Sequence, residues 1–343
     1  MGSQTPSYRM LGIEDLDAVA ELDRQSGGVA RRGFISKRLA SQERHPDAFI
    51  SMAAMTNDAL AGFVFCHMIE GEFGGTERMA ILDALGVDPH HQGHGLGHQM
   101  LDNLITEVRE RGGREIRTQA HWNQRGMIDF FCSTDFSLAP RLVLECGPDA
   151  HIGILHTEDD SDEIQSGSSA MNHGLQDYTV EIDFSDSSGD DFEALSRDKI
   201  PLRSLQADDI DAVLRIDRKI TGQDRGEYYR RKFSEVLEES GVRISLVAEL
   251  DGQVVGFIMA RVDYGEFGRT DSVAVIDNIA IAPSARGHHV GHALMDQLLT
   301  NLRTLRVQTA RTEIEWNRFD LSRFLERCGF CPSPHLALSQ RLD

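Results

Sequence analysis

Residues 92–97 read Gln-Gly-His-Gly-Leu-Gly, and residues 286–291 read Arg-Gly-His-His-Val-Gly. Each stretch follows an apolar run and precedes a segment whose apolar residues have helical spacing. A glycine-rich turn that opens a helix exposes backbone N–H groups at the positive end of the helix dipole. Glycine also lets an anion approach the backbone without a Cβ clash. The sequence therefore predicts two sites for a phosphate or a diphosphate.

The offset of 194 positions between these stretches holds over most of the chain without a gap. It pairs residues 71–76, Gly-Glu-Phe-Gly-Gly-Thr, with residues 265–270, Gly-Glu-Phe-Gly-Arg-Thr. It also pairs Trp122-Asn123 with Trp316-Asn317. We therefore predict two copies of one domain, at residues 1–147 and 201–343, each of ordinary single-domain size.

Residues 148–200 have no counterpart in this repeat and contain 14 acidic and 2 basic residues. Such a composition buries too little apolar surface to offset the entropy of ordering, which predicts an acidic linker. Within it, Tyr178, Val180, Ile182 and Phe184 alternate with polar residues, as in a half-buried strand. We expect that stretch to dock on one of the domains.

Composition and charge limit the classes of partner and compartment. The formal net charge of −20 repels nucleic acid and anionic membranes, so neither is an expected partner. No apolar run reaches 18 residues, and the first residues lack a signal-peptide pattern. The five cysteines include one Cys-x-x-Cys, at Cys328 and Cys331, without a second pair at zinc spacing. We expect a cytoplasmic protein without a metal.

Each copy has the pattern of an α/β domain. In the first copy we expect a helix at 14–24, two strands at 48–55 and 60–69, and a further strand at 79–87. Asn57-Asp58 predicts the turn between the first two strands. An amphipathic helix follows at about 96–110. A short strand, a helix and a closing strand are expected to complete the copy.

Two other phosphate-binding motifs fit the glycine-rich turn poorly. A Walker A loop ends in Gly-Lys-Ser/Thr, which the chain lacks at this point. A dinucleotide-binding fingerprint has the order Gly-x-Gly-x-x-Gly inside a parallel βαβ unit, whereas residues 93–97 read Gly-x-Gly-x-Gly after a hairpin.

Residues 85–97 and 279–291 instead resemble the acetyl-coenzyme A loop, Gln/Arg-x-x-Gly-x-Gly/Ala, of the GNAT acetyltransferase superfamily. Trp316-Asn317 and the segment 324–330, Phe-Leu-Glu-Arg-Cys-Gly-Phe, are similar to further motifs of that family. The resemblance covers both copies, nearly all of the chain except the linker. It implies two tandem domains, each a mixed, mostly antiparallel sheet flanked by helices.

The resemblance also implies where acetyl-CoA would bind. The fourth and fifth strands would splay apart, the turn would hold the diphosphate, and the edge of the preceding strand would pair with the pantetheine arm. The implied coenzyme-binding residues are Leu85, Val87, Gln92, Gly93, His94, Gly95, Leu96, Gly97, His98 and Asn123 in the first copy, and Ile279, Ile281, Arg286, Gly287, His288, His289, Val290, Gly291, His292 and Asn317 in the second.

The chain departs from the family pattern at two positions. His289 replaces a glycine of the loop, and a left-handed backbone there would cost a non-glycine residue about 1 kcal/mol. At the position of the family's usual general acid, a Tyr, the chain has Phe131 and Leu325, which cannot donate a proton.

The departing thiolate, with a reference pKa of about 8.5, needs little help, but the attacking amine must be neutral. Freeing a lysine-like amine at pH 7 costs roughly 4.6 kcal/mol, whereas an α-amino group costs about 1 kcal/mol. Candidate bases are Asp83 and Asp277, kept in both copies, and Glu315 on the fifth strand of the second copy. Glu72, Glu266 and Glu313 are further carboxylates near the expected clefts.

These features predict an N-acetyltransferase that transfers an acetyl group to a primary amine, on a small molecule or a peptide, by direct attack. The alternative is an acyl-CoA-binding sensor or a structural pseudo-enzyme in one or both domains. A longer acyl donor and a homodimer stay open as well. The sequence does not distinguish which copy is catalytic.

Overall fold

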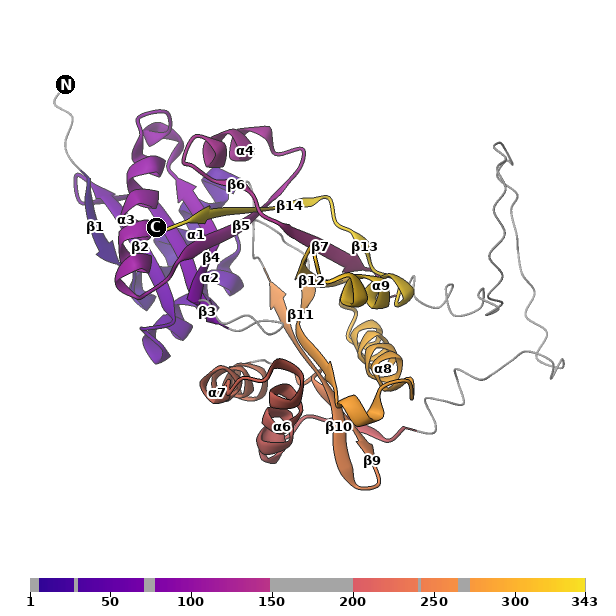
Figure 1. Ribbon diagram of the computed structural model, residues 1–343. Helices are drawn as coiled ribbons and strands as arrows, with labels where there is room; N and C mark the ends of the chain where they lie inside the picture. The colour runs from indigo at the N-terminus through magenta and orange to yellow at the C-terminus, as the bar shows by residue number, and fades with distance from the viewer. Residues whose placement is uncertain are drawn as a thin grey trace, which may run out of the picture.

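The computed structural model describes residues 6–27, 30–70, 78–148, 200–239, 242–264 and 272–342. It contains two mixed sheets of seven strands, each flanked by helices (Figure 1). The predicted α/β class with two tandem domains of this architecture is confirmed. Glu72, Glu266 and the strand expected at 178–184 lie outside the described residues.

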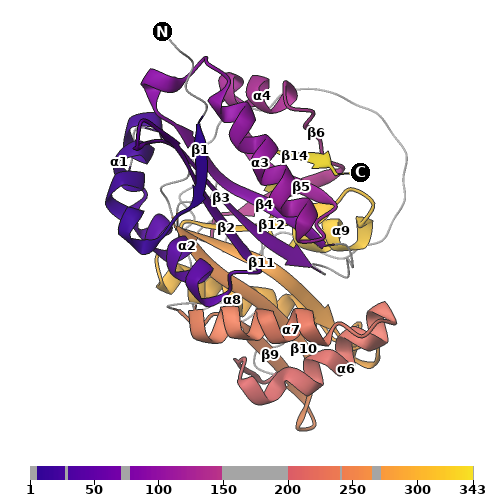
Figure 2. The ribbon, with the colours of Figure 1, turned by 90° about the vertical axis from the view of Figure 1, so that its left-hand side faces the viewer.

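The described residues of the first half supply six strands of its own sheet and four helices. Its strands are β1 (Ser7–Met10), β2 (Phe49–Thr56), β3 (Ala59–Glu70), β4 (Arg78–Val87), β5 (Glu115–His121) and β6 (Ser137–Leu138). Its helices are α1 (Leu16–Gly27) and α2 (Arg32–Arg44) on one face of the sheet, and α3 (Leu96–Glu110) and α4 (Arg125–Cys132) on the other (Figure 2). Asn57 and Asp58 have φ values of 52° and 60°, as the predicted turn requires.

The second half repeats these elements. Its strands are β8 (Leu202–Ser204), β9 (Leu246–Leu250), β10 (Gln253–Tyr264), β11 (Ser272–Ile281), β12 (Thr309–Glu315) and β13 (Cys331–Pro332). Its helices are α6 (Ile210–Thr221), α7 (Gly226–Ser234), α8 (Val290–Thr304) and α9 (Phe319–Arg327). Short helical turns are Ile13–Asp15, Pro89–His91, Ala207–Asp209, Pro283–Ala285 and the π-turn Glu235–Glu239. The described residues form no helix long and apolar enough to cross a membrane.

Helix α2 and its counterpart α7 were not predicted from the sequence. The buried face of α2 combines Phe34, Ile35 and Leu39 with Arg38, which is only 6% exposed. Because a charged residue occupies the middle of the buried stripe, the apolar periodicity of the segment is incomplete.

The last strand of each half lies in the sheet of the other half. Strand β7 (Arg141–Cys146) lies between β12 and β13, and β14 (His335–Arg341) lies between β5 and β6 (Figure 1). The prediction that each closing strand completes its own copy was therefore wrong.

Two prolines explain this exchange. Pro140 and Pro334 occupy equivalent positions just before the exchanged strands and favour an extended backbone, so the chain continues outward instead of turning back. The carbonyl groups of these prolines accept hydrogen bonds from the opposite halves, from Trp316 N at 3.1 Å and from Trp122 N at 3.0 Å. The point where each chain segment passes into the opposite half is therefore held by an equivalent tryptophan-to-proline backbone hydrogen bond.

The exchange also joins the hydrophobic cores. Leu338 of β14 is 3% exposed and packs in the core of the first half, and Leu144 of β7 is 4% exposed in that of the second. All seven residues of β14 have a partner on β5, from His335 opposite His121 to Arg341 opposite Glu115. Neither half contains all the strands of its own sheet.

A local irregularity opens each sheet next to this exchanged strand. The register between β3 and β4 skips Asp83, and that between β10 and β11 skips Asp277, so each aspartate lies at a β-bulge. The parallel ladder from β4 to β5 ends at Ile81, and that from β11 to β12 ends at Val275. Beyond these points the two strands of each pair diverge, as the resemblance implied.

Separate production of residues 1–147 and 200–343 tests the strand exchange. Each half alone is expected to self-associate or aggregate, because the edge of β5 or β12 and its apolar neighbours are left uncovered. Mixing the two halves is expected to give a one-to-one complex, which size-exclusion chromatography with light scattering would detect. Two stable monomers that do not bind one another would contradict the exchange.

Candidate active site

The glycine-rich turns have the left-handed backbone that their residue types predict. In the first half Gly93 and Gly95 have φ values of 75° and 81°. In the second half Gly287 has a φ of 80°, and His289 also adopts a positive φ of 55°. The position that departs from the glycine pattern thus keeps the left-handed conformation, with the strain that this entails for a side chain.

Each turn leads directly into a long helix. Gly95 is the N-cap of α3, and His289 is the N-cap of α8. The first N–H groups of a helix have no partner within the helix, and they carry the positive end of its dipole. A Cβ atom added at Gly291 would lie 3.3 Å from the ring of Phe324, which shows how closely α8 approaches α9.

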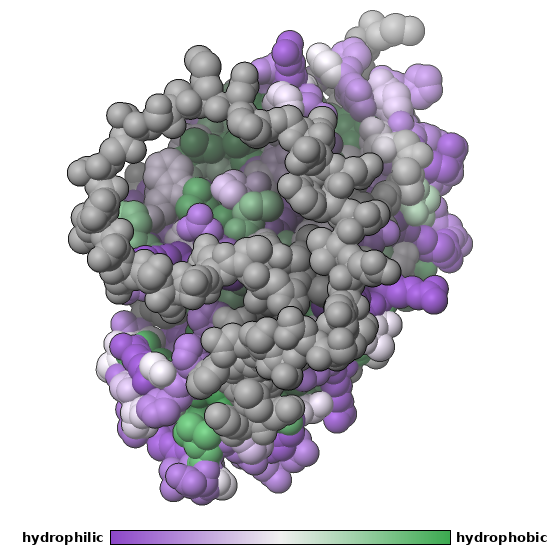
Figure 3. Space-filling view, turned by 90° about the vertical axis from the view of Figure 1, so that its right-hand side faces the viewer, coloured by the Kyte–Doolittle hydropathy of each residue, from purple (hydrophilic) through white to green (hydrophobic). Residues whose placement is uncertain are grey.

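A cleft of about 990 Å³ opens at the N-terminus of α8. One wall is the end of β11, and the opposite wall is the start of α9. The face of the molecule that carries α8 and α9 has apolar surface among mainly hydrophilic surface (Figure 3). The lining residues are Asp217, Ile220, Thr221, Asn278, Ile279, Ala280, Ile281, Ala285, Arg286, Gly287, His289, Val290, Gly291, His292, Asn317, Arg318, Phe319, Asp320, Leu321 and Phe324.

Most of the residues that the sequence analysis assigned to coenzyme binding in the second half line this cleft. His288 is the exception, since its Nδ1 lies 3.1 Å from the carbonyl oxygen of Arg286. Val290 is 1% exposed and belongs to the core, so only its backbone is available to a ligand.

The equivalent residues of the first half lie at the end of β4, in the turn that leads into α3, and just after β5. His94 Nδ1 lies 2.8 Å from the carbonyl oxygen of Gln92, and Gln92 Nε2 donates to the carbonyl oxygen of Val87 at 2.9 Å. His98 Nε2 lies 3.1 Å from Ser133 Oγ. Leu96 is 6% exposed and packs in the core with Leu85 and Val87 at its margin. Asn123 is exposed, and its N–H donates to His121 Nδ1 at 3.3 Å.

The two bulge aspartates lie beneath the splayed strands in buried ion pairs. Asp83 is 1% exposed, with Arg38 Nε at 3.0 Å and His67 Nδ1 at 2.9 Å from Oδ2. Asp277 is 2% exposed and pairs with Lys232 Nζ at 3.2 Å and with Arg261. Each carboxylate therefore connects the bulge to α2 or α7. Neither lines the cleft of the second half.

The carboxylates on β12 lie where the two halves meet. Glu313 accepts hydrogen bonds from Gln119 Nε2 at 2.7 Å and Arg141 Nε at 2.5 Å, both from the first half. Glu315 has a side chain that is 51% exposed, with Arg141 Nη1 at 3.8 Å. It lines a second cavity, of about 830 Å³, formed by β5, β6, β14 and the end of β12. Asn317, which follows β12, lines both this cavity and the cleft at α8.

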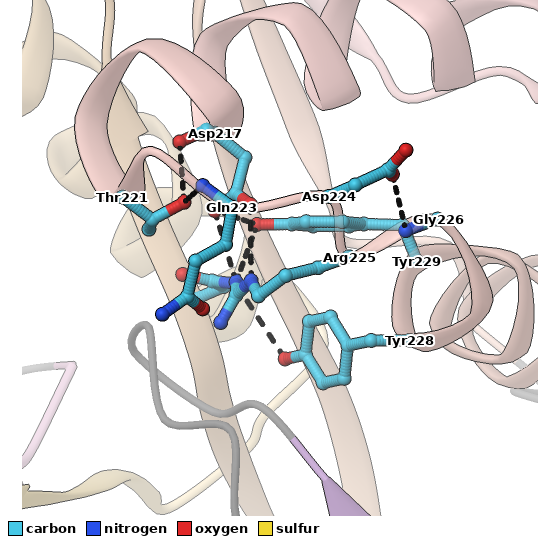
Figure 4. Close-up of polar contacts among 9 residues, drawn as sticks. Asp217, Thr221, Gln223, Asp224, Arg225, Gly226, Tyr228 and Tyr229 are labelled. Carbon is cyan, nitrogen blue, oxygen red and sulfur yellow. Dashed lines mark hydrogen bonds and ion pairs between the residues drawn. The ribbon is translucent and has the colours of Figure 1, made fainter.

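The polar part of the cleft lining was not predicted from the sequence. Asp217 of α6 and Asn278 of β11 line the cleft, and the buried Tyr229 of α7 is hydrogen-bonded to both. Asp217 accepts hydrogen bonds from Arg225 Nε at 3.0 Å and from the Tyr229 hydroxyl at 2.9 Å (Figure 4). Tyr229 in turn accepts from Asn278 Nδ2 at 3.0 Å, and the Tyr228 hydroxyl lies 3.5 Å from the same nitrogen. Burial raises the pKa of Tyr229, so its hydroxyl stays protonated at neutral pH.

The same positions of the first half are largely apolar. The pair Asp23–Arg31 is kept, with Arg31 Nε 3.0 Å from Asp23 Oδ2. Phe34, Ile35 and Ala84, however, stand where the second half has Tyr228, Tyr229 and Asn278, and all three pack in one hydrophobic cluster. A position-by-position comparison of the two copies was the signal in the sequence that would have found this difference.

The described residues contain no group of three or more His, Cys, Asp or Glu side chains arranged to hold a metal ion. The i, i+4 histidine pairs that open α3 and α8 bond instead to backbone and to Ser133, or contact Phe130 and Phe324 through their rings.

The sequence profile of the Acetyltransferase (GNAT) family matches residues 16–132 and 210–330. An N-alpha-acetyltransferase of Saccharolobus solfataricus is 33% identical over 98 residues, which is 28% of this chain and 50% of that protein. The chain thus spans about half the length of this curated relative.

Solved structures with a similar fold cover nearly the whole chain. A tandem GNAT protein from the clavulanic acid biosynthesis pathway has a TM-score of 0.60 at 13% identity, over 99% of both chains. The glucosamine N-acetyltransferase region of a fungal β-N-acetylglucosaminidase has a TM-score of 0.60 at 14% identity, over 99% of this chain and 38% of that one. A GCN5-related N-acetyltransferase from Sphaerobacter thermophilus has a TM-score of 0.55 at 13% identity, over 98% and 96%. At these identities the likeness concerns the fold alone.

Substitution at the N-cap of α3 tests the backbone of the turn. Gly95→Ala is expected to lower the free energy of unfolding by about 1 kcal/mol, since a Cβ there meets no atom but the φ of 81° disfavours it. Gly126→Ala is the matched control, because its Cβ also meets nothing and its φ is ordinary, and urea unfolding should show no loss there. Equal stabilities of the two variants would contradict the strained-turn account.

Proposed function

Because the chain belongs to the GNAT acetyltransferase family, we propose that it transfers an acetyl group from acetyl-CoA to a primary amine by direct attack. The observation that carries this proposal is the cleft of the second half. It joins the N-terminus of α8 to the end of β11, where β11 has diverged from β12, and its lining includes the polar residues Asp217 and Asn278. A site with these three parts can hold an anion, an extended chain and a polar acceptor side by side.

The residues present fit the coenzyme. Gly287 and His289 have positive φ and would turn successive N–H groups of the loop toward a diphosphate, at the positive end of the α8 dipole. Past Val275 the edge of β11 that faces β12 has no ladder partner, so it is available to pair with the amide groups of a pantetheine arm.

The chemistry that bound acetyl-CoA would supply is a thioester whose thiolate leaves readily, with a reference pKa of about 8.5. The residues of the chain then have three tasks. Backbone N–H groups on the open edge of β11 would stabilise negative charge on the carbonyl oxygen. Phe324 and Leu321 would exclude water from one wall. The side of the cleft lined by α6 and by Asn278 of β11 would receive the amine.

We propose an α-amine as the preferred acceptor. Asp83 and Asp277 are buried in ion pairs, so we propose that they hold the bulges and do not take the amine proton. Glu315 is exposed and lines the second cavity, which shares Asn317 with the cleft, so it is the carboxylate that we propose as proton acceptor, through water. An amine that costs only about 1 kcal/mol to deprotonate at neutral pH suits such weak assistance. The similarity to an N-alpha-acetyltransferase supports the same class of acceptor.

A second function is favoured for the first half. Its turn keeps both positive-φ glycines, but Phe34, Ile35 and Ala84 pack in a hydrophobic cluster where the second half has its hydrogen-bonded network. We propose that this half binds acyl-CoA without turnover, or serves to complete the sheet of its partner half. In that arrangement the second half alone is catalytic.

A matched pair of charge substitutions tests this division. Gly93→Glu and Gly287→Glu place a carboxylate at equivalent positions, both with open space around the Cβ and a similar φ. With acetyl-CoA and an Ala-initiated peptide, a thiol-release assay should show turnover reduced about tenfold or more by Gly287→Glu, because the added charge repels the diphosphate. Gly93→Glu should retain wild-type turnover. Absence of turnover in the wild type on any primary amine would contradict catalysis, and equal loss in both variants would contradict the division.

A further inference from the structure

The buried amide of Asn278 has one polar atom that the protein does not use. Asn278 is 4% exposed and lines the cleft of the second half. Its Nδ2 lies 3.0 Å from the Tyr229 hydroxyl and 3.5 Å from the Tyr228 hydroxyl. Among the described residues, no hydrogen bond reaches its carboxamide oxygen.

The surrounding network fixes which atom of the amide faces the tyrosines. The Tyr229 hydroxyl donates its single proton to Asp217 Oδ1 at 2.9 Å. It must therefore accept from its other neighbours, which are Arg225 Nη2 at 3.1 Å and the Asn278 amide. Because only the NH₂ group of the amide can donate, the amide nitrogen faces Tyr229 and the oxygen is left as an acceptor for the cleft.

Asn278 lies at the end of the cleft away from the diphosphate loop. It precedes the end of β11 at Ile281 by three residues, about 10 Å along a strand. The residues beside it in the cleft wall are Asp217 and Thr221 of α6, on the face of the sheet opposite α8. The coenzyme loop and Asn278 thus approach the gap between β11 and β12 from different sides.

We propose that the carboxamide oxygen of Asn278 accepts a hydrogen bond from the N–H of the incoming neutral amine and so orients its lone pair toward the thioester. This inference rests on the proposed acetyltransferase function of the second half. It gives the direct contact with the amine nitrogen to a neutral oxygen, and the proton still leaves through water to Glu315. The first half has Ala84 at this position and lacks the group.

A neutral oxygen suits the reaction better than a charged one. A carboxylate beside the amine would stabilise the ammonium form, which cannot attack. The charges around Asn278 are already paired, Asp217 with Arg225 and Asp277 with Lys232 and Arg261. Other titratable groups in the same cleft wall or network are Glu235, Tyr228, Tyr229, Arg286, His289, His292, Arg318 and Asp320.

Two substitutions in the full-length chain test the assignment, with an Ala-initiated peptide as the amine and acetyl-CoA as the donor. Asn278→Ala should raise the KM for the peptide about tenfold, the usual effect of one lost hydrogen bond, and leave the KM for acetyl-CoA unchanged. Asn278→Asp, nearly the same shape, should shift the pH profile of kcat/KM for the peptide upward, since its charge favours the ammonium form. Asn103→Ala, on the exposed face of α3, is the control and should match the wild type.

The possible outcomes separate this inference from the function on which it rests. If the wild type has no turnover on the peptide or on a lysine side chain, the proposed function fails. If the wild type turns over but Asn278→Ala leaves the peptide KM unchanged, or raises both KM values equally, the assignment of Asn278 is overturned. If Asn278→Ala does not fold, an unshifted pH profile in Asn278→Asp overturns it.

Discussion

The reciprocal exchange of β7 and β14 is the constraint on which the rest of the structure depends. Each exchanged strand covers the outer edge of β5 or β12, which is the strand that splays away from β4 or β11. A strand that loses backbone hydrogen bonds to one neighbour is held in the sheet by the hydrogen bonds on its other edge. Here the other half of the chain supplies those hydrogen bonds, and the contacts of Pro140 and Pro334 with the opposite tryptophans fix the crossing. The strand that diverges in each half is therefore held in place by a strand from the other half.

The two halves share the same sheet, β-bulge and glycine-rich turn, but they differ in the residues that pack beside the bulge. The bulge aspartate, its cationic partner on α2 or α7, and the positive-φ turn are present twice. The contacts of α2 and α7 with the sheet differ, because Tyr228, Tyr229 and Asn278 form a hydrogen-bonded network where Phe34, Ile35 and Ala84 pack in a hydrophobic cluster. Buried polar groups cost free energy unless they are satisfied, so a network that leaves one oxygen unused is a feature more typical of a binding site than of a core.

Much of this arrangement could be predicted from the sequence, and the limits have physical causes. The turns at 92–97 and 286–291, the hairpin at Asn57-Asp58 and the helix at 96–110 follow from local backbone preferences and periodicity, which one segment carries by itself. The strand exchange could not be predicted that way, because β7 would pair with β5 or with β12 by the same backbone hydrogen bonds. Helix α2 was missed because Arg38 interrupts its buried stripe, and Asn278 was missed because a single amide has no pattern.

The central claim is that the N-terminus of α8 and the open edge of β11 form the coenzyme site of the second half. The most direct measurement is a crystal structure of the full chain grown with acetyl-CoA. The account predicts the diphosphate within hydrogen-bond distance of the N–H groups of residues 287–291, and the thioester near the point where β11 and β12 diverge. A diphosphate bound elsewhere, or a cleft of the second half that stays empty at saturating coenzyme, would contradict it.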